Sequence, residues 1–289
     1  MVFSKSLTTK EVARLCRVSD ATVKRWEEAG VLQSERTNGG HRRFRAAEVA
    51  RFQRAQNPGT KISNGGKPSV KTKSRNEISL PSGSSLFHSL IIGDEEEVAD
   101  FMIGAFLHGT TLTKLFDEML CPAMHQIGNL WFKGELTVAQ EHLATRTAHN
   151  AIFRLRQLLP IPETSGKLAM CCGVEGDFHE LPTCLAQTTM ENSGWEVVNF
   201  GANMPLYSLA EEAVRNLPGV ICISATILTD IERFVRDYKE FRERISKHKT
   251  QVIIGGRAFC DEEVRRRIPA ENYAVSFSEV SNFLQTIIH

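Results

Sequence analysis

The second half of the chain alternates short apolar runs with stretches in which apolar residues recur at helical spacing. The apolar runs have the length and continuity of strands that are buried on both faces; they lie at 168–172, 196–200, 220–224, 251–254 and 273–275. The helical patterns lie at 184–192, 206–216, 231–246, 262–267 and 278–287. Because a helix follows each strand, the pattern predicts an α/β domain over 163–289 with a Rossmann-like (flavodoxin-like) parallel sheet.

Upstream of this region, apolar residues follow a helical period only. Four stretches show it, at 86–92, 95–107, 112–131 and 138–159. The second stretch begins with Asp94 and Glu97, and the fourth with Thr137 and Gln140, which are pairs with the spacing of helix caps. Four amphipathic helices with short connections predict a four-helix bundle over 79–162.

The beginning of the chain has a third pattern, two short helices around a tight turn followed by a hairpin. The elements are predicted at 9–16 and 21–29 (helices), 31–32 and 44–45 (strands that flank an Asn-Gly turn) and 48–56 (a third helix). This order predicts a winged helix-turn-helix domain over 1–56, an α domain with a β-wing whose second helix enters the major groove of DNA.

Side chains suited to DNA lie on two elements of this head. The second helix turns Val23 and Trp26 inward, so its polar residues point outward, and basic-capable residues after the hairpin turn suit phosphate contacts. The candidate DNA-binding residues are Thr22, Lys24, Arg25, His41, Arg42 and Arg43. The alternative is a surface helix pair whose charges are merely solvated.

Charge separates the head from the rest of the chain. Residues 1–75 hold 17 Lys and Arg against 6 Asp and Glu, whereas the remainder holds 18 against 28. A basic head on an acidic body is typical of a DNA-binding domain joined to another function. Between them, 57–78 are rich in Gly, Pro, Ser and Lys without periodicity, which predicts a flexible linker.

Cysteine usage and hydropathy indicate the compartment. The seven cysteines form no CxxC pair, which favours a reducing compartment over a disulfide framework. The amino terminus lacks the apolar core of a signal peptide, and no apolar run approaches 18 residues. We therefore expect a cytoplasmic protein without membrane contact.

The loop after the first predicted strand of the α/β domain carries candidate metal chemistry. It contains Asp177, Phe178 and His179, and a carboxylate can orient an imidazole that ligates a metal. The alternative is a surface histidine, with Asp177 and Glu180 as a helix capping pair. Two further loops, at 224–226 and 255–256, are expected at the same carboxyl edge of the sheet, where α/β proteins bind ligands.

With its motifs stated, the head can be compared with known families. Thr9-Lys10-Glu11-Val12-Ala13, the run 23–32 and Gly40-His41-Arg42-Arg43-Phe44 resemble the winged helix-turn-helix of the MerR family of transcription regulators. The resemblance implies binding to pseudo-palindromic double-stranded operator DNA by two copies of the protein.

The rest of the chain resembles cobalamin-binding proteins. The stretch 131–142 resembles the helical cap, and the three sheet loops resemble the DxHxxG, SxL and GG signature of the cobalamin-binding domain. The resemblance implies that His179 is the lower ligand of cobalt and that Asp177 binds its other ring nitrogen. The implied cofactor-binding residues are Trp131, Phe132, Glu141, His142, Asp177, Phe178, His179, Ser224, Thr226, Gly255 and Gly256. Without this resemblance, Trp131 would be interpreted as a core residue, and Glu141 and His142 as a solvated helix start.

Taken together, the chain resembles the light-responsive, cobalamin-dependent repressors of the CarH/LitR group and their light-independent relatives. That resemblance implies a repressor, not an enzyme, in which adenosylcobalamin holds a dimer or tetramer on the operator until light breaks the cobalt–carbon bond. Three residues depart from the pattern: Pro182 replaces Gly, Thr226 replaces Leu, and Phe132 replaces the His that captures cobalt after photolysis. His142, His125 or water would have to take that last role.

Alternatives stay open at this stage. The same architecture could sense haem or another tetrapyrrole, or could be a cofactor-independent repressor released by a protein antagonist. A corrinoid methyl-carrier subunit shares the bundle and the α/β domain, but the basic head and the lack of a nucleophile–base constellation argue against it.

Overall fold

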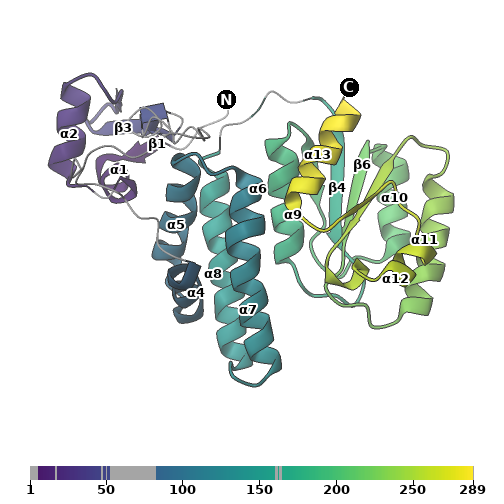
Figure 1. The fold of residues 1–289 in the computed structure, drawn as a ribbon. Helices are drawn as coiled ribbons and strands as arrows, with labels where there is room; N and C mark the ends of the chain where they lie inside the picture. Colours follow the sequence, from purple (N-terminus) through teal and green to yellow (C-terminus); the bar gives the residue numbers. More distant parts are fainter. Residues whose placement is uncertain are drawn as a thin grey trace, which may run out of the picture. The chain divides into compact units, whose positions relative to one another are not determined.

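The computed structural model describes residues 6–16, 18–46, 48–49, 51–52, 83–159, 162 and 165–288 (Figure 1). The chain divides into two compact units, which are described separately: Met1–Thr111 with Pro122–Leu159, and Leu112–Cys121 with Pro160–His289. In the described part of the chain, no helix is long and apolar enough to cross a membrane.

The head is a small helical domain with a three-stranded antiparallel sheet. Its elements are β1 (Ser6–Thr8), α1 (Thr9–Leu15), α2 (Asp20–Glu28), β2 (Glu35–Arg36) and β3 (Arg42–Arg45), with strand order β1-β3-β2. Thr8 and Glu11 form a capping box on α1, and the Ser19 side chain caps α2. The predicted helix-turn-helix and wing are therefore present.

One predicted strand of the wing is wrong. The N–H groups of Val31 and Leu32 donate to the Trp26 carbonyl, so these residues close the end of α2, and Leu32 is fully buried. The wing strand is instead the exposed pair Glu35–Arg36, which has no apolar pattern to reveal it. The predicted third helix lies partly, and the predicted linker 57–78 entirely, outside the described residues.

All four helical stretches predicted downstream of the linker are present. They are α4 (Gly83–Ile92), α5 (Glu95–Leu107), the joined segments α6 (Leu112–Lys114), η1 (Leu115–Leu120) and α7 (Cys121–Phe132), and α8 (Val138–Arg156). The Asp94 side chain caps α5, and Thr137 with Gln140 forms the predicted capping box on α8. Small residues of α8, among them Ala144, Ala148 and Ala151, are buried where α8 packs against α4 and α5.

The third stretch contains a π-helical turn that the sequence pattern did not predict. Within η1 the hydrogen bonds reach one residue further than in an α-helix, and the Cys121 N–H donates to the Phe116 carbonyl. Pro122 follows directly, and a proline has no N–H for the carbonyl four residues earlier. The wider turn is the local adjustment to that missing donor.

The α/β domain has the predicted parallel sheet. The strands are β4 (Leu168–Gly173), β5 (Glu196–Asn199), β6 (Val220–Ser224), β7 (Gln251–Gly255) and β8 (Asn272–Ala274), in the order β5-β4-β6-β7-β8. The helices are α9 (Leu181–Asn192), α10 (Leu206–Asn216), α11 (Ile231–Ile245), the 3-10 turn η2 (Arg257–Phe259), α12 (Glu262–Arg267) and α13 (Phe277–Ile288). This strand order is that of flavodoxin-like folds.

Alternation along β4 shows how both faces of the sheet are buried. Met170 and Cys172 pack with α10 and α11 on one face, whereas Ala169 and Cys171 pack with α9 and α13 on the other (Figure 1). All seven cysteines lie in the described part of the chain and none forms a disulfide. Burial raises the pKa of the Cys222 thiol to about 12, so this thiol stays protonated and serves as a small core residue.

The first turns of the third helical stretch are fixed to α13 within the α/β unit. The Asp117 carboxylate accepts hydrogen bonds from the N–H groups of Phe277 (2.8 Å) and Ser278 (2.9 Å) and from the Ser278 hydroxyl (2.7 Å). The Phe116 ring meets the Phe277 ring edge-on at 5.7 Å. Asp117 therefore supplies acceptors for N–H groups that a helix start leaves unpaired.

Candidate functional site

The three predicted loops begin at adjacent points of the sheet. Gly173 of β4, Ser224 of β6 and Gly255 of β7 are in register with one another at the carboxyl ends of their strands. The strand order reverses here, because β4 pairs with β5 on one side and with β6 on the other. Open α/β sheets place ligands at such points.

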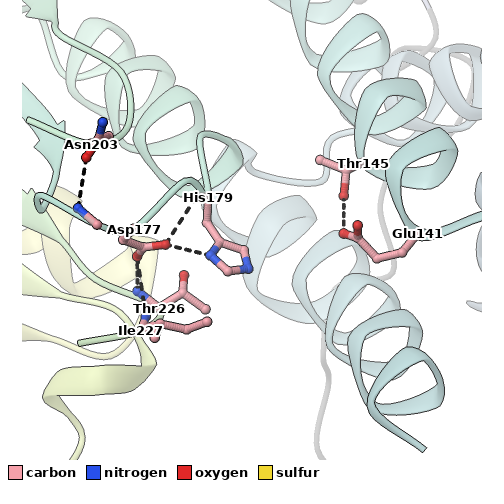
Figure 2. A network of polar contacts seen from close by, with 8 residues as sticks. Glu141, Thr145, Asp177, His179, Asn203, Thr226 and Ile227 are labelled. Carbon is pink, nitrogen blue, oxygen red and sulfur yellow. Dashed lines mark hydrogen bonds and ion pairs between the residues drawn. The ribbon is translucent and has the colours of Figure 1, made fainter. Parts of the chain in front are cut away.

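The Asp177 carboxylate joins two of these loops. Its Oδ1 atom accepts hydrogen bonds from the ring Nδ1 (2.6 Å) and the backbone N–H (3.1 Å) of His179. Its Oδ2 atom accepts from the backbone N–H groups of Thr226 (2.5 Å) and Ile227 (3.4 Å) (Figure 2). The Asp177 side chain is 2% exposed and the His179 side chain 46% exposed. The second ring nitrogen of His179 points away from Asp177 (Figure 2).

The environment of Asp177 keeps it ionised. Burial by itself would raise the pKa of the carboxyl group, but the hydrogen bonds from the His179 ring and from the N–H groups of Thr226 and His179 outweigh it, so the pKa lies below its ordinary value. An ionised Asp177 accepts from a protonated Nδ1, which fixes the tautomer of the neutral ring with its lone pair on Nε2. That is the form in which an imidazole ligates a metal.

The start of α9 tests the predicted capping pair of this loop. Glu180 occupies the N-cap position, but its side chain makes no capping hydrogen bond, and the Asp177 carboxylate is used elsewhere. The alternative of an Asp177–Glu180 capping pair is therefore wrong. Pro182 lies in the first turn of α9, where its missing N–H costs nothing, so the departure from the Gly signature leaves the loop intact.

The glycine pair is demanded by the protein backbone itself. Gly256 has φ +102°, and a Cβ atom there would lie 2.3 Å from the Ala225 carbonyl oxygen. A Cβ atom on Gly255 would lie 3.1 Å from the Ala274 carbonyl oxygen. The pair thus permits the close approach of the loops after β6 and β7, whichever ligand binds nearby.

The other sheet-loop residues implied by the resemblance differ in their burial and in their contacts. The Ser224 side chain is buried, and Thr226 contributes its backbone N–H to Asp177. Phe178 is 77% exposed although it lies between two fixed residues of the loop. An exposed aromatic side chain at this edge suits contact with a flat ligand.

Pattern reasoning missed Asn203, in the connection between β5 and α10. Its side-chain Oδ1 accepts from the Gly176 N–H (2.8 Å), and its backbone N–H donates to the Asp177 carbonyl (2.9 Å) (Figure 2). The residue also has φ +57°. The only sequence signal is an Asn two residues after Gly201 and two residues before Pro205, which marks a turn without indicating its partner.

The helical unit carries a separate group of predicted residues around the connection between α7 and α8. Trp131 is 45% and Phe132 85% exposed, so the alternative of Trp131 as a core residue is wrong. The Glu141 carboxylate accepts from the Thr145 hydroxyl at 2.8 Å (Figure 2) and lies 2.6 Å from Nδ1 of the exposed His142. Two large exposed aromatic side chains in succession, as at the end of α7, are typical of a contact surface.

In the head, the predicted DNA-binding residues fall into two kinds. Lys24 and Arg25 are exposed on α2, and His41 is exposed beyond the turn. Arg42 instead forms an ion pair with Glu27 of α2, with its Nε 2.8 Å from the carboxylate. Its hydrogen bond lowers the pKa of Glu27. Arg42 therefore holds the wing against α2, whereas the Arg43 guanidinium donates to the Arg42 carbonyl at 3.1 Å.

Comparisons with known protein families match two parts of the chain, the head and the helical bundle. Residues 84–156 match the family model of the B12 binding domain, and residues 8–44 match the model of the MerR family regulatory proteins. The chain therefore combines a MerR-type DNA-binding head with a B12-binding domain.

Individual relatives cover between 58% and 85% of the chain. The HTH-type transcriptional repressor CarH of Myxococcus xanthus is 24% identical over 264 residues, which cover 85% of this chain and 87% of that protein. The dimethylamine corrinoid protein of Methanosarcina barkeri is 24% identical over 169 residues, 58% of this chain and 79% of that protein. The structure of the Methanosarcina barkeri monomethylamine corrinoid protein matches with a TM-score of 0.59 at 18% identity, over 70% of this chain and 96% of that one, and supports the fold alone.

The residues present fit a cobalt that is carried inside a larger ligand. In the described part of the chain, no group of three or more His, Cys, Asp and Glu side chains could hold a bare metal ion. A metal bound by His179 would therefore need its other ligands from the bound molecule, as the ring of a tetrapyrrole supplies them. The buried, ionised Asp177 behind the imidazole is the partner that such a ligand requires.

Proposed function

We propose that this protein is a transcription repressor whose grip on double-stranded operator DNA is controlled by bound cobalamin, in the form of adenosylcobalamin. The observation that carries the proposal is the Asp177–His179 pair at the carboxyl edge of the sheet, in a chain that also has a MerR-type head. His179 is the lower ligand of cobalt, and Asp177 holds its ring in place. When bound, adenosylcobalamin supplies a cobalt–carbon bond that light can break.

Further residues of the chain support this role. Within the helical unit, Trp131 and Glu141 would bind the cofactor, the exposed indole by supplying apolar area and the carboxylate by supplying a hydrogen-bond acceptor. Phe178, exposed beside His179, packs against the ring system. These side chains bind and orient the cofactor and exclude water from it.

DNA binding depends on the association of copies. A head of this kind covers one half-site, so two heads on linked subunits bind with a higher effective concentration than one head alone. We propose that the cofactor-bound protein is a dimer or tetramer and that loss of the upper ligand separates its subunits, which releases the operator.

The response to light depends on what captures cobalt after photolysis. Phe132 cannot ligate a metal. His125 lies seven residues before it on the same face of α7, about 10 Å away along the helix axis, and is exposed. His142, 74% exposed and next to Glu141, is the other candidate. We propose that the light response persists although Phe132 cannot ligate a metal, with His125, His142 or water in place of the missing histidine.

An absorption spectrum with sizing of each sample tests the proposal. The full-length protein is loaded with adenosylcobalamin in the dark and measured before and after green light. A bound spectrum without the dimethylbenzimidazole ligand, bleached by light together with a fall in oligomer size, is the expected result. His179→Ala should abolish tight binding. Absence of bound corrin in the wild-type protein would overturn the proposal and direct the search to haem, other tetrapyrroles or a protein antagonist.

A further inference from the structure

The loop that carries His179 is joined to neighbouring elements through several of its residues, among them Glu175, which forms an ion pair with Arg233 at 2.7 Å. Asp177 N–H donates to the Val174 carbonyl, and Gly176 has φ +82°, so the loop turns sharply directly after β4. The Asp177 side chain fixes the loop to the connection after β6 on one side only. The position of the imidazole therefore depends on what restrains the backbone of residues 176 and 177 on the other side.

Asn203 provides that restraint from the connection after β5. Its Oδ1 atom accepts from the Gly176 N–H at 2.8 Å, and its own N–H donates to the Asp177 carbonyl at 2.9 Å. The next residue, Met204, donates its N–H to the Gly173 carbonyl at 2.9 Å and pairs with Val174 as a parallel bridge. Successive residues of one connection thus hold both ends of the turn that precedes His179.

The backbone of Asn203 explains why an asparagine is present. Its φ of +57° is in the left-handed region, which most residues with a Cβ atom avoid and which Asn tolerates well. Among the described non-glycine residues, only Leu217, at the end of α10, shares a positive φ. Glycine would adopt this conformation more easily but has no side chain to accept from Gly176, so asparagine meets both requirements.

We infer that Asn203 is a positioning residue for cobalt ligation, which sets the direction of the His179 ring through Gly176 and Asp177. This inference rests on the proposed function, because it assigns to Asn203 a role in cofactor binding. Asn203 itself touches the loop backbone and does not ligate the metal. Its loss should leave Asp177 and His179 in contact but spread the orientations of the ring.

Substitutions at this position separate the effect of the side-chain hydrogen bond from the effect of the left-handed backbone conformation. Asn203→Gly removes the acceptor and keeps the left-handed conformation, whereas Asn203→Asp keeps an acceptor in a residue that tolerates it. Leu217→Gly is the matched control, because it relaxes the other left-handed residue, 59% exposed and on a different connection. Loss of one such hydrogen bond should weaken cobalamin binding about 3- to 10-fold.

Electron paramagnetic resonance of the full-length protein loaded with cob(II)alamin gives a readout of ligation itself. Nitrogen-14 below cobalt splits each line into three, and labelling the protein with nitrogen-15 histidine changes this to two only when a protein imidazole is the ligand. We expect Asn203→Gly to lose a substantial part of the histidine-ligated signal and to bind more weakly, while Asn203→Asp and Leu217→Gly match the wild type.

The outcomes distinguish the inference from the function on which it rests. Wild-type ligation in Asn203→Gly, or equal losses in Asn203→Gly and Asn203→Asp, would overturn the positioning role. A wild-type protein that binds no cob(II)alamin would overturn the proposed function instead. In that case the rate of amide hydrogen exchange at Gly176 tests whether Asn203 restrains the loop. Faster exchange in Asn203→Gly supports the restraint, and unchanged exchange refutes it.

Discussion

Replacing Asp177 with asparagine removes one charge from the centre of the site at nearly constant shape. The carboxylate accepts four hydrogen bonds, two from His179 and one each from Thr226 and Ile227. In Asp177→Asn one oxygen becomes an NH2 group, a donor that faces other donors. At least one buried N–H loses its acceptor, at about 1–3 kcal/mol, and the remaining bonds lose their charge assistance.

We therefore expect Asp177→Asn to lower the free energy of unfolding by about 2–4 kcal/mol at neutral pH. Cobalamin affinity should fall about 10- to 100-fold, as for other substitutions of the partner of a metal-bound histidine. Denaturant unfolding of the cofactor-free protein measures the first effect, and absorbance titration with adenosylcobalamin in the dark measures the second. Glu180→Gln, next to the same histidine but without a capping role, is the matched control and should change neither.

The difference in stability should also depend on pH in a defined direction. Folding lowers the pKa of Asp177, so its stabilising effect is complete above the unfolded pKa of about 3.9 and is lost as the pH falls through the lower folded pKa. The difference in unfolding free energy between wild type and Asp177→Asn should therefore be present at neutral pH and close as the pH falls below about 4. A gap that persists unchanged in acid, or no gap at neutral pH, would refute the electrostatic role of Asp177.

Three further substitutions test other parts of the structure. Gly256→Ala should destabilise the protein by more than about 2 kcal/mol, because its Cβ atom meets the Ala225 backbone; a loss below about 0.5 kcal/mol in denaturant unfolding would contradict this. Asp117→Asn should speed amide exchange in the first turn of α13 and lower the free energy of unfolding by about 1–2 kcal/mol. Glu118→Gln, at an exposed position of η1, should do neither. Arg43→Ala should weaken binding to all DNA sequences about equally. It should reduce the slope of log binding constant against log salt concentration by about 1. A loss of affinity that depends on a single operator base would instead mean that Arg43 reads that base.

Periodicity predicted the elements well wherever burial dictates the sequence. All five strands of the α/β domain were predicted from apolar runs between amphipathic helices, and their parallel arrangement from the alternation of strands and helices. Periodicity failed to predict the local structure where backbone hydrogen bonds, and not burial, determine it. Leu32 is apolar because it fills the core of the head, not because it is in a strand, and the exposed β2 has no pattern. The π-helical turn before Pro122 also escaped, because its apolar residues keep a nearly helical spacing.

The site was predictable to the extent that its chemistry is local in sequence. Asp177 and His179 are two residues apart, so their pairing could be inferred from the loop alone. The support from Asn203 could not, since that residue lies 27 positions from Gly176 and joins it only through the sheet. The resemblance implied Gly256 as a cofactor-binding residue, whereas the backbone contacts of the protein itself already require a glycine there.

The central claim is that cobalamin bound through His179 controls DNA binding. The direct test is the affinity of the full-length protein, in the dark, for duplex DNA selected by it from a random pool, measured with and without adenosylcobalamin. The account predicts at least about tenfold tighter binding with the cofactor, a coupling of about 1.4 kcal/mol, and no such gain in His179→Ala. Equal affinity with and without adenosylcobalamin in the wild-type protein would contradict it.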